Sequence, residues 1–158
     1  MSETRIIQDD DARFLLFKVA GELYGTPLLG IREVVEPQEP KPIPNTVPCF
    51  SGVINLRGQV VGVVDLRRRF GHEATKHHGM ALMVFETDSG PLAAVVDEID
   101  CVVQLTSSHI DTKPVVRANV PTEYLMGIGN QDGRLISLID LNKILGSEEL
   151  KLVSDARV

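Results

Sequence analysis

The sequence is poor in the residue types on which several large classes of protein depend. It contains no tryptophan, five phenylalanines, two tyrosines and only two cysteines, Cys49 and Cys101. So few aromatic residues argue against a platform that stacks nucleic-acid bases. Two cysteines cannot build a disulfide framework, and we expect two free, buried thiols in a reducing, cytoplasmic setting.

Long apolar runs and an excess of positive charge are also missing. No apolar run approaches the roughly 20 residues that cross a bilayer, and the opening residues MSETRIIQDDD lack the apolar core of a signal peptide. We therefore expect no direct membrane insertion. The net charge of −6 disfavours binding to nucleic acid. Positive charge is concentrated in Arg67, Arg68 and Arg69, and such a run is typical of a solvated face.

The clearest positive feature is an internal repeat. Residues 52–71 and 127–146 align without a gap at a constant offset (127 − 52 = 75). Six positions are identical and six more are apolar in both windows, which predicts two copies of one supersecondary unit with the same buried face. The identical pairs are Gly52/Gly127, Asn55/Asn130, Gly58/Gly133, Asp65/Asp140, Leu66/Leu141 and Gly71/Gly146.

The segments before these windows repeat one another as well. Residues 14–19 and 81–85 predict strands, each followed by a turn and a return strand. IREVV at 31–35 is echoed by IDCVV at 99–103, at an offset of 68 (99 − 31). Proline disrupts strand pairing, so irregular crossing segments are expected in the two proline-rich linkers that follow, residues 36–50 and 104–125.

Each repeat window predicts a hairpin and then a helical turn. The dipeptide DG at 132–133 is a strong turn signal because both positions need a positive φ, and RG at 57–58 holds the equivalent place. Asp65 and Asp140 each precede apolar residues at a spacing of four, so each carboxylate is expected to cap a helical turn. Ser147 is expected to cap a short C-terminal helix. These patterns predict an all-β fold of two small five-stranded barrels.

Patterns for catalysis and metal binding are weak. Asp65 and Asp140 resemble an acid/base pair, but the repeat places one in each barrel and capping explains both. The four histidines lack the spacing of metal ligands, and residues 72–79, which hold three of them, are expected to form a solvated connector. No nucleophile or nucleotide-binding motif occurs. We expect no catalytic residue, cofactor or metal, and a small hydrolase that uses the aspartates and a histidine remains an unsupported alternative.

The two repeats differ at one informative position, where Arg57 stands against Asp132. Aspartate suits the turn, whereas arginine presents a planar cation with five donors to solvent. Arginine is enriched at binding hot spots, which favours a contact with a partner. A solvated turn residue is the other interpretation.

The order of motifs resembles the CheW family of chemotaxis coupling proteins, and the resemblance covers nearly the whole chain. In the first half it rests on IREVV at 31–35, PN at 44–45, GVINLRG at 52–58 and VVDLR at 63–67. The second half adds VDEI at 96–99, TEYLMG at 122–127 and GSEEL at 146–150. Gly62 is a departure, because the family usually has proline there.

The resemblance implies two intertwined SH3-like barrels that arose by duplication. It implies a flexible tail over residues 1–12 and a CheW-like domain over 13–158. Repeat units then cover about 13–71 and 80–146, with a short C-terminal helix over 147–153.

The resemblance also implies a function, namely a non-catalytic adaptor that bridges the cytoplasmic tips of methyl-accepting chemoreceptors to the histidine kinase CheA. The adaptor is expected to be a cytoplasmic monomer in isolation and to be recruited to receptor arrays, where it alternates in rings with the similarly folded regulatory domain of the kinase. The residues that match the family's receptor-facing groove are Ile31, Glu33, Val34, Gly52 and Arg57. The kinase interface is expected on apolar barrel-end surface without assigned residues. A second interpretation is that the protein is a CheW-like scaffold of a non-flagellar chemosensory system, which controls surface motility or second-messenger synthesis.

Overall fold

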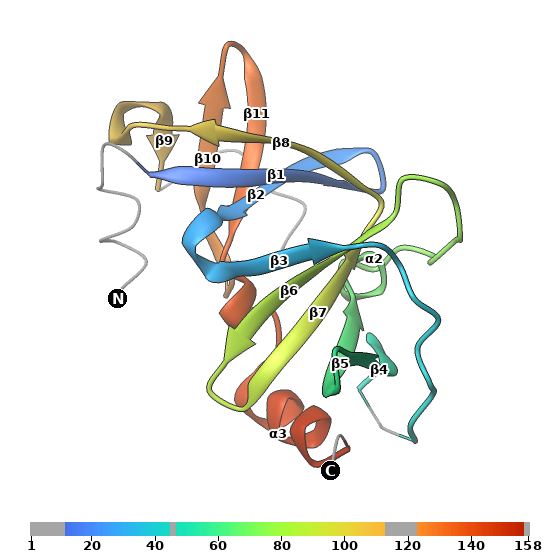
Figure 1. Cartoon of the computed structure of the whole chain (residues 1–158). Coiled ribbons are helices and arrows are strands. Elements are labelled where there is room, and N and C mark those ends of the chain that lie inside the picture. Colours follow the sequence, from blue (N-terminus) through green and yellow to red (C-terminus); the bar gives the residue numbers. More distant parts are fainter. Residues whose placement is uncertain (1–11, 45–46, 113–122, 157–158) are drawn as a thin grey trace.

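The structure is a computed structural model that describes residues 12–44, 47–112 and 123–156. These residues form eleven strands in two sheets, with two α-helices and three 3-10 turns (Figure 1). Part of the second proline-rich linker and most of the expected N-terminal tail lie outside the described residues. The elements are β1 (Arg13–Val19), β2 (Glu22–Pro27), η1 (Leu28–Gly30), β3 (Ile31–Val35), β4 (Phe50–Leu56), β5 (Gln59–Asp65), α2 (Leu66–Arg69), β6 (Ala81–Thr87), β7 (Gly90–Val96), β8 (Glu98–Gln104), η2 (Ser107–His109), β9 (Ile110–Asp111), β10 (Leu125–Gln131), β11 (Arg134–Ile139), η3 (Leu141–Lys143) and α3 (Ser147–Ala156).

The two sheets have the same internal order. The six-stranded sheet, the upper one in Figure 1, runs β8-β1-β2-β11-β10-β9, and the five-stranded lower sheet runs β3-β6-β7-β5-β4. β1 and β2 correspond to β6 and β7, β8 corresponds to β3, and the hairpin of β10 and β11 corresponds to that of β4 and β5. The pairing β11–β2 is parallel in one sheet and β5–β7 is parallel in the other. The repeat in the sequence is therefore a repeat in the strand pairing.

Each sheet takes strands from both repeats. The first hairpin, β1–β2, lies between strands of the second repeat, and β6–β7 lies between strands of the first. The short strand β9 also adds a sixth member to the upper sheet within the linker that we expected to be irregular. In the lower sheet, a single bridge between Lys41 and Val53 takes the corresponding place.

The central residues of the exchanged hairpins are largely apolar because both faces of these strands are buried there. In β1, Phe14 and Leu16 belong to the core of the upper barrel, whereas Leu15 and Phe17 belong to a larger cluster that lies between the barrels. In β6 the side chains alternate in the same way between the lower-barrel core and the shared cluster. The period-2 alternation of a strand places successive residues in different cores. The shared core therefore joins the two barrels.

The predicted caps are confirmed at Asp65 and Asp140. Asp65 Oδ1 accepts a hydrogen bond from the Arg67 N–H at 3.0 Å, and Asp140 Oδ1 accepts one from the Asn142 N–H at 3.0 Å. The prediction for Ser147 is wrong, because α3 already includes this residue. Gly146 precedes the helix, and its N–H donates to Glu149 Oε1 at 2.9 Å, so the glutamate supplies half of a capping box.

Three further expectations need correction. Cys49 is buried, but Cys101 is exposed, because β8 is an edge strand with one face open to solvent. Arg67 is only 4% exposed and does not belong to a solvated face. Ala12 is expected in the flexible tail, yet it is buried and its carbonyl accepts a hydrogen bond from the Leu105 N–H at 3.0 Å.

Among the described residues, every helix is too short or too polar to span a membrane.

Candidate functional site

The β4–β5 turn has the geometry that the repeat predicts. Arg57 has a φ of 51°, as does Asp132 in the second repeat. The Gly58 N–H donates to Asn55 Oδ1 at 2.8 Å, and the equivalent glycine donates to Asn130 Oδ1 at 2.9 Å. The identical asparagines therefore close both turns, a role that our sequence analysis missed although their position before the turn indicates it. In the first turn, the bond from the Gly58 N–H to Asn55 stabilises the turn although arginine stands at position 57, where aspartate would suit the positive φ better.

Arg57 is joined to Glu33 by a two-pronged ion pair. Arg57 Nη2 lies 2.5 Å from Glu33 Oε1, and Nη1 donates to Oε2 at 2.8 Å. The Arg57 side chain is 69% exposed, whereas that of Glu33 is 20% exposed. The hydrogen bond from Arg57 lowers the pKa of Glu33, and the same bond raises the pKa of Arg57. Arg57 is therefore an exposed cation that a half-buried carboxylate holds in one orientation.

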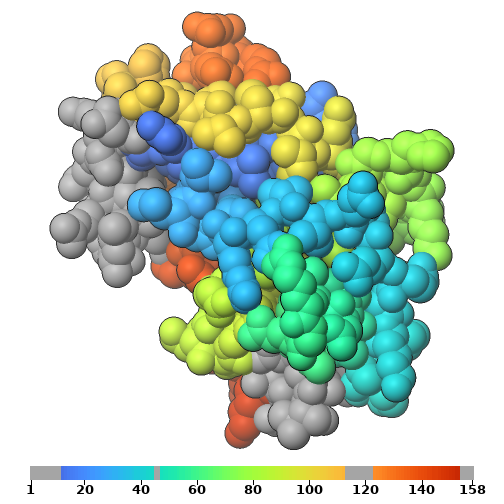
Figure 2. All heavy atoms as spheres, in the orientation of Figure 1, coloured from blue at the N-terminus to red at the C-terminus, as the bar shows by residue number. Residues whose placement is uncertain are grey.

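This ion pair connects opposite edges of the lower sheet. β3 and β4 are the two ends of the strand order, and the β4–β5 turn reaches β3 through side chains. Arg32 adds a second link, because its Nη1 lies 3.1 Å from both Gln59 Oε1 and Glu86 Oε1. Figure 2 shows β3 in light blue crossing the visible face, with the green tip of the β4–β5 hairpin against it. The pair thus closes the barrel and presents its cation at the surface.

Exposed apolar side chains lie on the same strands as these charges or next to those strands in the sequence. Leu29 is 87% exposed and precedes β3, while Val34 on β3 and Val60 on β5 are also exposed. Ile31 is half-buried and packs against the shared core. An exposed apolar group next to an oriented arginine is the composition found at binding hot spots. Four of the five predicted contact residues, namely Ile31, Glu33, Val34 and Arg57, therefore lie on β3 or at the turn that contacts it.

Gly52 is different, because it is buried and acts through the backbone. A Cβ atom at this position would lie 2.1 Å from the Lys41 carbonyl oxygen, and the φ of Gly52 is +130°. The missing side chain lets the first linker bond to β4, where the Lys41 N–H donates to the Val53 carbonyl at 2.8 Å. The geometry gives Gly52 a structural role, and its predicted contact with a partner stays a prediction.

The second barrel keeps the apolar positions of this surface but not its charges. Val102 and Leu135 are exposed at the places equivalent to Val34 and Val60. At the places of Glu33 and Arg57 stand Cys101 and Asp132. Arg134 Nη2 lies 3.0 Å from Asp100 Oδ2, which links the β10–β11 hairpin to β8. The exposed Arg57 therefore distinguishes the lower barrel from the upper one.

A buried ionic cluster joins the barrels at another place. Arg67 Nη2 lies 2.9 Å from Asp65 Oδ2, and its Nη1 lies 3.2 Å from Asp97 Oδ1. Asp97 also accepts hydrogen bonds from the Ala20 N–H at 2.7 Å and bonds to His77 Nε2 at 2.9 Å. Asp97 thus links the β1–β2 turn of the upper sheet to α2 and to the connector. Burying charges is tolerable when each is paired in this way.

The described residues offer little for chemistry. In residues 12–44, 47–112 and 123–156, no three histidine, cysteine, aspartate or glutamate side chains are grouped so as to hold a metal. Asp65 is the last residue of β5 and Asp140 follows β11, so the two carboxylates lie on different sheets, and each caps its own helical turn. Burial raises the pKa of the Cys49 thiol to about 11, so it is protonated at neutral pH and is a poor nucleophile.

Comparisons with known proteins identify the class. The family model described as CheW-like domain matches residues 13–149, so the chain belongs to this family. The chain is similar to the chemotaxis protein CheW of Klebsiella aerogenes, with 33% identity over 143 residues that cover 90% of this chain and 86% of the relative. It is also similar to Protein FrzA of Myxococcus xanthus, with 27% identity over 91% of each chain.

A solved structure agrees with these sequence matches. The scaffolding protein TtCheW from Thermoanaerobacter tengcongensis superimposes with a TM-score of 0.80 and 28% identity, over 88% of this chain and 97% of that one. The predicted all-β fold of two SH3-like barrels is therefore confirmed.

Proposed function

We propose that this protein is a non-catalytic adaptor that couples methyl-accepting chemoreceptors to a CheA histidine kinase. The observation that carries the proposal is the exposed Arg57, which is paired with Glu33 of β3, the strand that also exposes Val34, in a chain of the CheW family. An adaptor needs surfaces for two partners rather than a reaction centre. The separation of Asp65 and Asp140 between the sheets agrees with such a role.

The receptor contact is proposed on the surface formed by β3 and the β4–β5 turn. Ile31 and Val34 would supply apolar contact, and Arg57 would bind a polar or acidic group of the receptor tip. Glu33 acts mainly through Arg57, because it is the less exposed member of the pair. Gly52 acts by keeping β4 and the first linker in place. The protein would act in the cytoplasm and be recruited to membrane arrays through its partners.

A bridging experiment tests this function. A receptor-tip fragment is immobilised, and the kinase is added with and without the full chain. The adaptor function predicts that the kinase is retained in proportion to the amount of chain added. Retention that does not depend on the chain, or no retention at saturating chain, would show that the protein does not couple the two partners.

A second candidate is the scaffold of another chemosensory system. This candidate is supported by the similarity of the chain to Protein FrzA, a relative whose name differs from CheW. Both candidates use the same fold and the same surface, and they differ in the receptor and the kinase that bind. The same bridging experiment, repeated with each receptor–kinase pair of the native cell, identifies the pair that the chain couples.

A further inference from the structure

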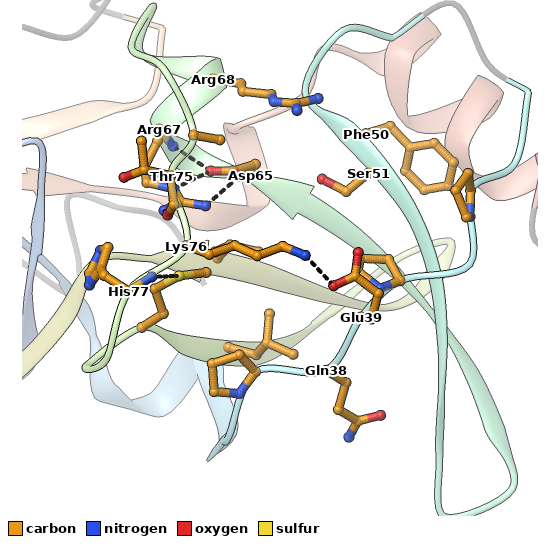
Figure 3. Close-up of a pocket in the computed structure, with 17 residues that line it drawn as sticks. Gln38, Glu39, Phe50, Ser51, Asp65, Arg67, Arg68, Thr75, Lys76 and His77 are labelled. Atoms are coloured by element: carbon orange, nitrogen blue, oxygen red, sulfur yellow. Dashed lines mark hydrogen bonds and ion pairs between the residues drawn. The ribbon is translucent and has the colours of Figure 1, made fainter.

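A pocket of about 550 Å³ lies on the lower barrel, away from the surface formed by β3 and the β4–β5 turn. It opens between the proline-rich linker after β3, helix α2 and the connector that precedes β6 (Figure 3). None of the five residues proposed for receptor contact is among the described residues that line it. The pocket is therefore a feature that the proposed function does not use.

The floor and one wall of the pocket are apolar. Phe50, Met80, Leu82 and Val95 contribute side chains from β4 and from the β6–β7 hairpin or its approach. The linker wall includes three prolines, which have no N–H group to donate. Leu82 is 1% exposed and Val95 is 6% exposed, so the floor of the pocket is part of the packed core of the lower barrel. A bound group would contact an apolar surface, and the pocket is large enough to hold an apolar side chain.

The mouth of the pocket carries positive charge. Arg68 is exposed on α2, and its side chain makes no hydrogen bond or ion pair with residues 12–44, 47–112 and 123–156. Lys76 Nζ lies 2.8 Å from Glu39 Oε2, and both side chains are largely exposed, at 80% and 74%. Figure 3 shows this pair spanning the pocket, with Arg68 on α2 and with Phe50 and Ser51 on the opposite wall. The Arg68 side chain is thus unpaired among the described residues, and Lys76 is paired with Glu39.

The third cation near the pocket is not available to a ligand. Arg67 is buried, and its guanidinium is neutralised by Asp65 and Asp97. Arg68 and Lys76 therefore supply the charge, in a protein whose net charge is −6. An exposed pair such as Lys76–Glu39 contributes little to stability, so another carboxylate can replace Glu39 at small cost.

We propose that this pocket binds an extended peptide segment of a partner protein in which an apolar side chain is followed by two acidic residues. The apolar side chain lies on the floor formed by Leu82 and Val95 and against Phe50 on the wall. One carboxylate pairs with Arg68, and the other displaces Glu39 from Lys76. Charge complementarity selects an acidic segment, and the bond that Glu39 already makes shows that a carboxylate fits above the floor.

The test is a titration of the full-length, ¹⁵N-labelled chain followed by NMR. The probe is a blocked pentapeptide of sequence Gly-Leu-Glu-Glu-Gly, and its matched controls replace both glutamates by glutamine or the leucine by serine. We expect saturable shifts of amides that line the pocket, and affinities for both controls that are lower by about tenfold. No saturable shifts, or equal binding of the glutamine peptide, would overturn the proposal.

Variants test the assigned roles. Arg68→Gln should weaken binding of the acidic peptide by about fivefold, and Glu39→Gln should strengthen it by about twofold because Lys76 is released. Lys151→Gln removes an exposed cation on α3, away from the pocket, and should leave the affinity unchanged. Unchanged binding by Arg68→Gln contradicts the proposal. The same shifts produced by inorganic phosphate at equal concentration would show an adventitious ion only.

Discussion

At the scale of single residues, two aspartates with the same place in the repeat have different surroundings. Asp140 caps a 3-10 turn, whereas Asp65 caps α2 and also pairs with the buried Arg67. Asp140→Ala should lower the free energy of unfolding by about 1 kcal/mol, the typical value of a cap. Asp65→Ala should cost about 3 kcal/mol, because it also leaves a buried cation short of a partner. Urea denaturation of both variants measures the difference.

An asparagine control separates the two roles of Asp65. Asn caps a helix well but carries no charge, so Asp65→Asn should retain the cap and lose the ion pair. Asp140→Asn should be nearly neutral by the same reasoning. Equal losses for the two alanine variants would contradict the assigned role of the Arg67 pair.

The sequence predicted the caps and the turns because both depend on residues close together in the chain. The fourfold apolar spacing after each aspartate indicates a helical turn, and the mismatch between Arg57 and Asp132 indicates an unusual cation. The partners of the charged residues were not predictable. Glu33 and Arg57 are 24 positions apart, and Arg67 and Asp97 are 30 apart. Solvation of Arg67 was the natural expectation for three consecutive arginines, and only the fold places Asp97 beside it.

At the scale of elements, the connector before β6 carries a pH-dependent contact. The hydrogen bond with Asp97 raises the pKa of His77 above its ordinary value of 6.5. The folded protein therefore binds this proton more tightly than the unfolded chain does. The resulting stabilisation is fully present below about pH 6.5 and is lost as the pH rises through the higher pKa of the folded state.

Thermal denaturation of His77→Gln tests this contact. The Tm of the wild type should exceed that of the variant by more at about pH 5.5 than at about pH 8.5. The neighbouring His78→Gln serves as the control, because the His78 ring makes no contact with a carboxylate among the described residues. A difference in Tm that does not change with pH would show that His77 is not protonated in this contact.

At the scale of the whole molecule, the exchange of first hairpins makes the two halves interdependent. β1 and β2 are buried between strands of the second repeat and the shared core, and β6 and β7 between strands of the first. Repeat alignment alone could not establish this pairing, because equivalent strands of the two copies present the same apolar pattern. The resemblance to the family implied intertwined barrels, and in the strand order each sheet contains strands of both repeats.

Fragments test the interdependence. Residues 1–75 and 76–158 should each lack a dispersed NMR spectrum when alone, because each exposes one face of a hairpin that is buried in the intact chain. Mixed in equal amounts, they should recover the spectrum of the folded protein. A folded spectrum from either fragment alone would mean that a single repeat closes its own barrel.

The most direct measurement for the whole account is a pair of titrations with the wild type and Arg57→Glu. Arg57→Glu places two carboxylates together at a largely exposed site, so the fold should persist while the receptor contact is lost. We expect the affinity for the receptor-tip fragment to fall by about 30-fold or more, as for a hot spot. The affinity for the kinase regulatory domain should remain within about twofold. As a control, Arg134→Glu reverses the charge of an arginine in the β10–β11 hairpin of the other barrel, which also pairs with a carboxylate, and it should leave receptor binding unchanged. Equal receptor affinity of wild type and Arg57→Glu would contradict the proposed coupling surface.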